Sequence, residues 1–179
     1  EALSKKINVK KNTIVLTPGS DAGIKNCLDL CVREKENVLT ISPTFAMVDI
    51  YSRIKRANQI KVHYDKNLNL DISKILNIIR KKKIALVIIA NPNSPTGTVI
   101  EEKELINIIS TCYERKTTIL IDEAYYGFSK ITVIRLIKRF PNLIVSRTFS
   151  KAYGLAGCRV GFLVSNPTLA LKLYNLRPM

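Results

Sequence analysis

Residues 143–165, LIVSRTFSKAYGLAGCRVGFLVS, place an apolar run on each side of a polar loop that contains glycine. The two runs, 143–148 and 159–165, are rich in branched aliphatic and aromatic side chains, which is typical of β-strands. The loop between them holds one lysine, Lys151, among hydroxylated, small and glycine residues. Lysine side chains usually lie on solvated faces, so a lysine just after an apolar strand raises the question of whether it belongs to a site.

The rest of the chain alternates strand-like segments with amphipathic helical patterns. The further strands expected are 13–17, 37–41, 60–64, 85–90 and 117–122, and the helices expected are 20–33, 44–57, 71–81, 101–115, 130–139 and 167–175. Asp71 precedes an apolar stripe with helical spacing, so it is predicted to cap its helix. The alternation predicts an α/β fold, a three-layer sandwich with a mostly parallel sheet. With 179 residues, 46% of them hydrophobic, the chain is long enough for one domain.

Composition argues against several classes of function. The formal net charge is +15, from 29 Lys and Arg against 14 Asp and Glu, but the basic residues lie in scattered clusters at the ends of predicted elements, so we expect no nucleic-acid partner. Four cysteines and one histidine occur without metal-ligand spacing, so we expect no metal site. No apolar run is long enough to span a membrane, and residues 1–12 contain no signal-peptide apolar region. We therefore expect a soluble, cytoplasmic protein without a membrane partner.

Polar, turn-prone segments follow five of the predicted strands. They are PGSDAG (18–23), SPTF (42–45), NPNSPTG (91–97), DEAYYG (122–127) and FSK (149–151). Because ligands bind beyond the carboxyl ends of parallel strands, these five segments are predicted to meet on one rim of the sheet.

The segment PGSDAG combines a turn with the start of a helix. The free N–H groups of Ser20 and Asp21, together with the positive end of the helix dipole, suit a phosphate group. The hydroxyls of Thr148 and Ser150 and the cation of Arg159 are candidates for the same anion. The alternative is an ordinary Asp or Ser cap on the helix.

Two further segments carry candidate ligand-binding side chains. Asp122 ends an apolar strand, where a carboxylate is costly without a partner, so it either holds a proton on an aromatic nitrogen or caps the next helix. Tyr125, three residues later, is placed to hydrogen-bond to the same ligand. The NPNSPTG loop has two prolines and is a candidate for a cis peptide bond, and its asparagines either point at a ligand or belong to a plain turn.

Lys151 completes a set of groups that suits one cofactor. A partly desolvated amine near the cation of Arg159 can form a Schiff base with an aldehyde or a ketone, whereas the alternative is a solvated loop lysine. Pyridoxal 5′-phosphate (PLP) needs an amine for its aldehyde carbon, a carboxylate for its ring nitrogen, donors for its phenolic oxygen and a phosphate site. The five segments together offer these groups, so PLP is the predicted cofactor.

The order of these motifs resembles the class I/II aminotransferases of PLP fold type I, especially the branch like histidinol-phosphate aminotransferase. The collinear motifs GSD, SPTF, NPNSPTG, DEAY and SKAYGLAGCRVG extend over nearly the whole chain. The resemblance implies that Lys151 forms the Schiff base and moves a proton, that Asp122 partners the ring nitrogen and that Tyr125 donates to the phenolic oxygen. The further cofactor contacts that it implies are Gly19, Ser20, Asp21, Phe45 (stacked on the ring), Thr148, Ser150 and Arg159. The family's asparagine before PTG is Ser94 here, preceded by Asn93, and either is a candidate contact to the cofactor.

The resemblance also implies an enzyme of amino-acid biosynthesis that moves an amino group between an amino acid or amino-phosphate and a 2-oxo acid. Family members are much longer, so residues 1–179 are expected to be the PLP-binding large domain, without an N-terminal arm and a C-terminal small domain. The full-length enzyme is expected to be a homodimer. Two alternatives share these motifs: a PLP-dependent decarboxylase of a phosphorylated amino acid, and an inactive PLP-binding fragment.

Overall fold

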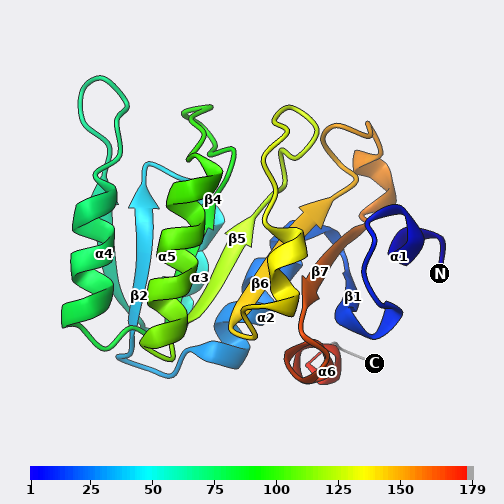
Figure 1. Ribbon diagram of the computed structural model, residues 1–179, viewed down its shortest axis with the longest axis horizontal. Coiled ribbons are helices and arrows are strands. Elements are labelled where there is room, and N and C mark those ends of the chain that lie inside the picture. Colours follow the sequence, from blue (N-terminus) through cyan, green and yellow to red (C-terminus); the bar gives the residue numbers. More distant parts are fainter. Residues whose placement is uncertain (177–179) are drawn as a thin grey trace.

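The computed structural model describes residues 1–176 and contains a seven-stranded sheet with helices on both faces (Figure 1). The strands are β1 (Ile14–Thr17), β2 (Asn37–Ser42), β3 (Asn58–His63), β4 (Leu86–Ala90), β5 (Thr118–Asp122), β6 (Leu143–Thr148) and β7 (Gly161–Ser165). Their order across the sheet is β1-β7-β6-β5-β4-β2-β3. Neighbours from β3 to β6 pair in parallel, and β7 is antiparallel to both β6 and β1. The predicted mostly parallel sheet is confirmed.

The antiparallel strand β7 has a local cause. Residues 149–160, which separate it from β6, contain no α-helix, whereas a parallel pair is usually joined by a crossover connection through an α-helix. That segment contains only the short 3₁₀ helix η3 (Ala156–Cys158), so the chain turns back beside β6. Both ends of the loop that carries Lys151 therefore lie at the same edge of the sheet.

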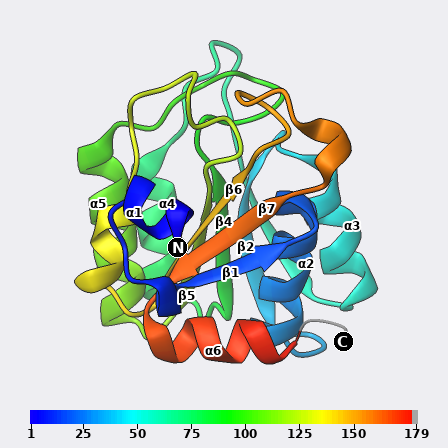
Figure 2. The ribbon, with the colours of Figure 1, turned by 90° about the vertical axis from the view of Figure 1, so that its right-hand side faces the viewer.

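Helices form a layer on each face of the sheet. They are α1 (Ala2–Lys6), α2 (Gly19–Cys31), α3 (Ala46–Ile54), α4 (Ile72–Lys81), α5 (Glu102–Glu114) and α6 (Pro167–Asn175), with the 3₁₀ helices η1 (Lys11–Thr13) and η2 (Ile134–Lys138). Figure 2 shows α2 and α3 on one side of the sheet and α4 and α5 on the other. Two buried hydrophobic clusters correspond to these layers, one packed on α4, α5 and η2 and one on α2, α3 and α6. The predicted three-layer α/β sandwich is confirmed.

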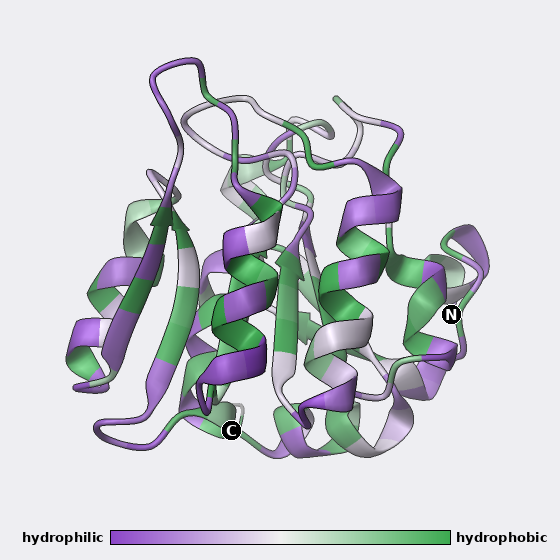
Figure 3. Ribbon diagram, turned by 60° about the vertical axis from the view of Figure 1, so that its left-hand side comes forward, coloured by the Kyte–Doolittle hydropathy of each residue, from purple (hydrophilic) through white to green (hydrophobic). Residues whose placement is uncertain are grey.

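Hydropathy follows the layers. In Figure 3 the strands at the centre of the sheet are mainly hydrophobic, whereas the helices carry both hydrophobic and hydrophilic residues, as amphipathic helices that cover a sheet do. Strands β4, β6 and β7 are buried over their whole length. Among residues 1–176, no helix combines the length and the apolar character needed to cross a membrane.

The predicted elements agree with the structure except in two places. All seven strands are present, and Asp71 caps α4 by accepting the backbone N–H of Lys74 at 2.9 Å. The helix predicted over 130–139 is wrong, because only the 3₁₀ helix η2 forms there. Its first residues, Ile131–Val133, are β-branched and disfavour an α-helix. The second difference is α1, a five-residue helix that was not predicted.

Candidate functional site

The carboxyl ends of β1, β2, β4, β5 and β6 lie at one edge of the sheet, because all five strands run in the same direction. Figure 1 shows the loops after β4, β5 and β6 along the upper edge. The first and last motifs of the chain touch there. A Cβ atom on Gly161 would lie 2.4 Å from the carbonyl carbon of Gly19 and 2.6 Å from the backbone nitrogen of Ser20, so only glycine permits this approach.

Donor groups from three segments form an open cradle beside this contact. The guanidinium of Arg159 lies over the start of α2, where its Nη2 would be 2.9 Å from a Cβ atom on Gly19. The Thr148 hydroxyl accepts the backbone N–H of Ser150 at 3.1 Å and lies 3.0 Å from its Oγ. No side chain caps α2, so the alternative of an ordinary Asp or Ser cap is wrong. Uncapped N–H groups at a helix start, two hydroxyls and an arginine suit an anion.

Two carboxylates lie behind this cradle. Asp122, at the end of β5, is only 5% exposed, and its carboxylate accepts a hydrogen bond from the Ser146 hydroxyl. Burial raises the pKa of Asp122 to about 6, although the Ser146 hydrogen bond acts in the opposite direction. Asp21 accepts the hydroxyl of Tyr51 at 3.0 Å, and its other oxygen is buried with no partner in the described chain. No helix begins directly after Asp122, so it is not a helix cap. A buried carboxylate of this kind is stabilised by a cationic N–H donor.

Tyr125 contacts both the amine of Lys151 and Ser94 of the NPNSPTG loop. The Nζ atom of Lys151 lies 5.1 Å from the centre of the Tyr125 ring. The pKa of the Tyr125 phenol is lowered, first by a hydrogen bond with Ser94 and then by one with Lys151. Lys151 itself is exposed, as is the whole segment 151–160, so the expected partial desolvation of this amine is not found in the described chain. The segment is a loop outside the sheet, and no helix layer covers it.

Asn93 joins two of the predicted segments. Its amide donates to the carbonyl of Pro43 at 2.9 Å and to the Thr96 hydroxyl at 2.7 Å, and its oxygen accepts the Thr44 hydroxyl at 2.8 Å. These internal hydrogen bonds agree with the alternative in which Asn93 belongs to a structured turn, and the expected cis peptide is confirmed at both prolines of the loop. The Asn93 side chain is occupied within the protein, whereas the neighbouring serine contacts Tyr125. Phe45 is exposed on the same rim, just before α3.

Two charged residues next to these groups were not predicted from the sequence. Glu123 and Arg147 form a buried ion pair, with Arg147 Nη2 2.8 Å from Glu123 Oε2. Each directly follows a member of the Asp122–Ser146 pair in the sequence. A charge at the end of an otherwise apolar strand was the available signal, because such a charge requires a partner.

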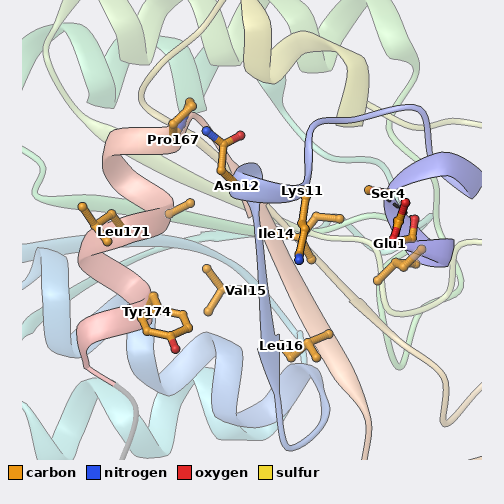
Figure 4. A pocket seen from close by; sticks show the side chains of 12 residues that line it. Glu1, Ser4, Lys11, Asn12, Ile14, Val15, Leu16, Pro167, Leu171 and Tyr174 are labelled. Atoms are coloured by element: carbon orange, nitrogen blue, oxygen red, sulfur yellow. Dashed lines mark hydrogen bonds between the residues drawn. The ribbon is translucent and has the colours of Figure 1, made fainter.

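A separate cavity of about 750 Å³ lies between the N-terminal segment, β1 and α6 (Figure 4). Leu16, Leu171 and Tyr174 are among the residues that line it. None of the candidate site residues lines this cavity. It is mainly apolar and carries no constellation of groups for chemistry, so the candidate site is the strand-end rim. Among the described residues, no group of three or more His, Cys, Asp or Glu side chains could hold a metal ion.

Comparison with known proteins gives consistent results. The family described as "Aminotransferase class I and II" matches residues 1–178. A histidinol-phosphate aminotransferase of Caldanaerobacter subterraneus subsp. tengcongensis is 38% identical over 176 residues, which are 98% of this chain and 49% of that protein. One from Clostridium novyi is 33% identical over 172 residues, 96% of this chain and 48% of that protein.

A solved structure has the same fold. The histidinol-phosphate aminotransferase of Sinorhizobium meliloti, in complex with pyridoxal-5′-phosphate, superimposes with a TM-score of 0.91 and 26% identity. The match covers 98% of this chain and 48% of that one. This chain therefore spans about half the length of the curated relatives that it matches.

Proposed function

The chain belongs to the class I and II aminotransferases, and on that premise we propose that the whole protein is a PLP-dependent aminotransferase whose cofactor-binding large domain is residues 1–179. The observation that carries the proposal is the arrangement at the rim. A buried carboxylate, an amine beside a phenol, and an arginine over a helix start come from three separate segments. Residues 177–179 of this proposed domain lie outside the described residues.

The residues present fit PLP. Asp122 is buried with its pKa raised by that burial, so a cationic N–H such as that of a protonated pyridine ring would stabilise its charged form. The Gly19–Gly161 contact leaves room for no side chain and presents the backbone N–H groups of the α2 start beside Arg159. That combination of a helix start and a fixed cation is what a phosphate monoester requires. The open cradle thus suits the phosphate of PLP, and the buried carboxylate suits its ring nitrogen.

PLP, when bound, supplies an aldehyde that condenses with amines and a ring that accepts electrons from the substrate. We assign to Asp122 the holding of a proton on the ring nitrogen, because its carboxylate is buried and its hydrogen bonds come from the neutral Ser146 hydroxyl and the backbone of Ala124. The first turn of α2, with Thr148, Ser150 and Arg159, is assigned to bind the phosphate and to fix the cofactor's orientation. Phe45, exposed on the rim, is assigned to stack on the ring.

Lys151 and Tyr125 act at the reacting end of the site. We assign to Lys151 Nζ the covalent attachment of the cofactor and the transfer of the proton from the Cα atom of the substrate. Tyr125 lies against this amine, and its lowered pKa favours a phenol that shares its proton with neighbouring groups. Ser94 hydrogen-bonds to Tyr125 and so belongs to the same cluster, whereas Asn93 supports the loop from behind.

Trapping the cofactor on Lys151 tests the proposal. Protein incubated with PLP and then reduced with borohydride should carry the cofactor on the peptide that contains Lys151, as mass spectrometry would report. Lys151→Ala should reduce this incorporation to background, because Lys151 supplies the amine that lies beside Tyr125. Lys130→Ala, which removes an exposed lysine from the neighbouring loop, is the matched control and should incorporate the cofactor normally. Equal incorporation by the Lys151→Ala protein would refute the assignment.

The relatives' names suggest the first substrates to assay. An amino-phosphate donor such as histidinol phosphate, with a 2-oxo acid acceptor, is the proposed pair for the whole protein. Release of CO₂ without formation of a new keto compound would instead favour the decarboxylase alternative. Binding of PLP by the whole protein without turnover of any donor would favour an inactive binding protein. The homodimer, the cytoplasmic location and the absence of nucleic-acid and membrane partners stay predictions.

A further inference from the structure

A buried ion pair that the proposed chemistry does not use lies directly behind the rim. Glu123 is 2% exposed and Arg147 is 7% exposed. The guanidinium donates twice to one carboxylate oxygen, from Nε at 2.9 Å and from Nη2 at 2.8 Å. Burial raises the pKa of Glu123, while the charge and hydrogen bonds of Arg147 act in the opposite direction. Both charges of this pair are hydrogen-bonded, and the pair lies next to Asp122 and Thr148 in the sequence, so we asked what it does for the site.

The carboxylate of Glu123 links the two ends of the loop 123–133. Its two oxygens accept the Thr132 hydroxyl at 3.0 and 2.9 Å, and Oε1 also accepts the backbone N–H of Val133 at 2.8 Å. Arg147 Nη2 donates to the same Thr132 hydroxyl at 2.7 Å. Residues at both ends of the loop 123–133 are therefore bonded to one another and to β6 through one carboxylate.

The same pair also contacts the first part of this loop, beside Tyr125. The guanidinium carbon of Arg147 is 3.5 Å from the ring centre of Tyr126, a close cation–π contact. At the loop tip, a Cβ atom on Gly127 would lie 2.7 Å from the Cβ of Ala152. The loop thus touches the residue that follows Lys151 in the chain, while Tyr125 touches the amine of Lys151 itself.

We propose that Glu123 and Arg147 are positioning residues, whose buried pair holds the 123–133 loop so that Tyr125 and the Lys151 segment keep the geometry that the cofactor needs. This inference rests on the proposed PLP site. A buried ion pair often adds little net stability compared with apolar residues of the same volume, and its best-supported use is to select one conformation. The pair joins a loop that is otherwise exposed at its tip to the rigid end of β6.

Two mild substitutions distinguish a role in positioning the loop from a role in folding of the whole domain. Arg147→Lys keeps the positive charge but loses the forked hydrogen bonds and the planar stacking on Tyr126. Thr132→Val removes the hydroxyl that both charged groups contact and leaves the ion pair in place. The matched control is Arg135→Lys, the same change in an ion pair with Glu102 that is exposed, with side-chain exposures of 69% and 36%.

Hydrogen exchange and cofactor binding are then measured on each folded variant. In the cofactor-free protein, Arg147→Lys and Thr132→Val should speed amide exchange in 123–133 while exchange in β4 and β5 stays at the wild-type rate. Each should weaken PLP binding by about tenfold, the scale of losing hydrogen bonds to a charged group, and shift the absorbance maximum of bound PLP. Arg135→Lys should change neither quantity.

The outcomes distinguish the two proposals. Wild-type exchange in 123–133 for both variants overturns the positioning role, and so does exchange that rises uniformly over the whole sheet. Unchanged PLP affinity and absorbance in a variant whose loop exchanges faster also overturns it. If the wild-type protein itself binds no PLP, the proposed function fails, while the exchange measurement still reports whether the pair holds the loop. If Arg147→Lys does not fold, Thr132→Val decides.

Discussion

The proposed site joins two regions that are built in opposite ways. At the ends of β5 and β6, the polar side chains are buried and paired, Asp122 with Ser146 and Glu123 with Arg147. In the segment 151–160, every residue is exposed. The sheet fixes the geometry of the first region before any ligand binds. The second region is held by a few contacts with neighbouring loops. We therefore expect a bound cofactor to order this region more than the first.

The largest expected effect concerns the point where the exposed segment enters the sheet. Gly161→Ala should lower the free energy of unfolding by about 3 kcal/mol, because the new methyl group would overlap the backbone of Gly19 and Ser20 and cannot be relieved by a side-chain movement. Urea unfolding measures this change. Gly157→Ala is the control inside the exposed segment, where nothing lies within 4 Å of the added Cβ. A similar loss of stability in both variants would contradict the claim that the Gly161 contact, and not the loop as a whole, is sensitive to an added methyl group.

The buried region should instead become more stable when one charge is removed. Burial gives Asp122 a pKa of about 6 in the folded protein, above its value in the unfolded chain, so the free energy of unfolding falls as pH rises between the two pKa values. At pH 8 the cofactor-free Asp122→Asn protein should be more stable than wild type by about 2 kcal/mol, and the gain should be smaller at pH 4.5.

The same substitution should weaken the binding of PLP, because a neutral amide cannot hold the proton of a pyridinium nitrogen. Urea unfolding at the two pH values and a PLP titration check the two effects. Asp71→Asn, at the cap of α4, is the control and should leave both quantities nearly unchanged, since Asn caps a helix as well as Asp does. Loss of stability at pH 8 in Asp122→Asn would contradict the account of a costly buried charge.

The smallest effect concerns the phenol at the boundary between the two regions. The pKa of Tyr125 is lowered first by the hydrogen bond with Ser94 and then by Lys151, so Ser94→Ala should raise the pH at which this phenol ionises. Titration of ¹³C-labelled tyrosine by NMR measures that pH. Tyr125→Phe identifies the signal by removing it. An unchanged midpoint in Ser94→Ala would show that the exposed amine alone sets the ionisation.

Much of the fold and of the candidate site could be predicted from local patterns. The apolar runs predicted all seven strands, and the polar segments after them identified the rim, because strand direction determines where such segments meet. Other features could not be predicted in this way. The occupation of the Asn93 amide by Pro43 and Thr96, and the pairing of Glu123 with Arg147, join residues from different segments, and no local pattern specifies such partners.

The sequence by itself determined the alternation of strands and helices, the ordered motifs and the types of group at the rim, since these follow from side-chain chemistry and spacing along the chain. Only the tertiary structure decided which groups are buried and which are paired. It buried Asp122 beside Ser146, left Lys151 exposed beside Tyr125, and brought Gly161 against Gly19. The physical reason is that desolvation and hydrogen-bond partners depend on neighbours in space, which only the packing of the layers provides.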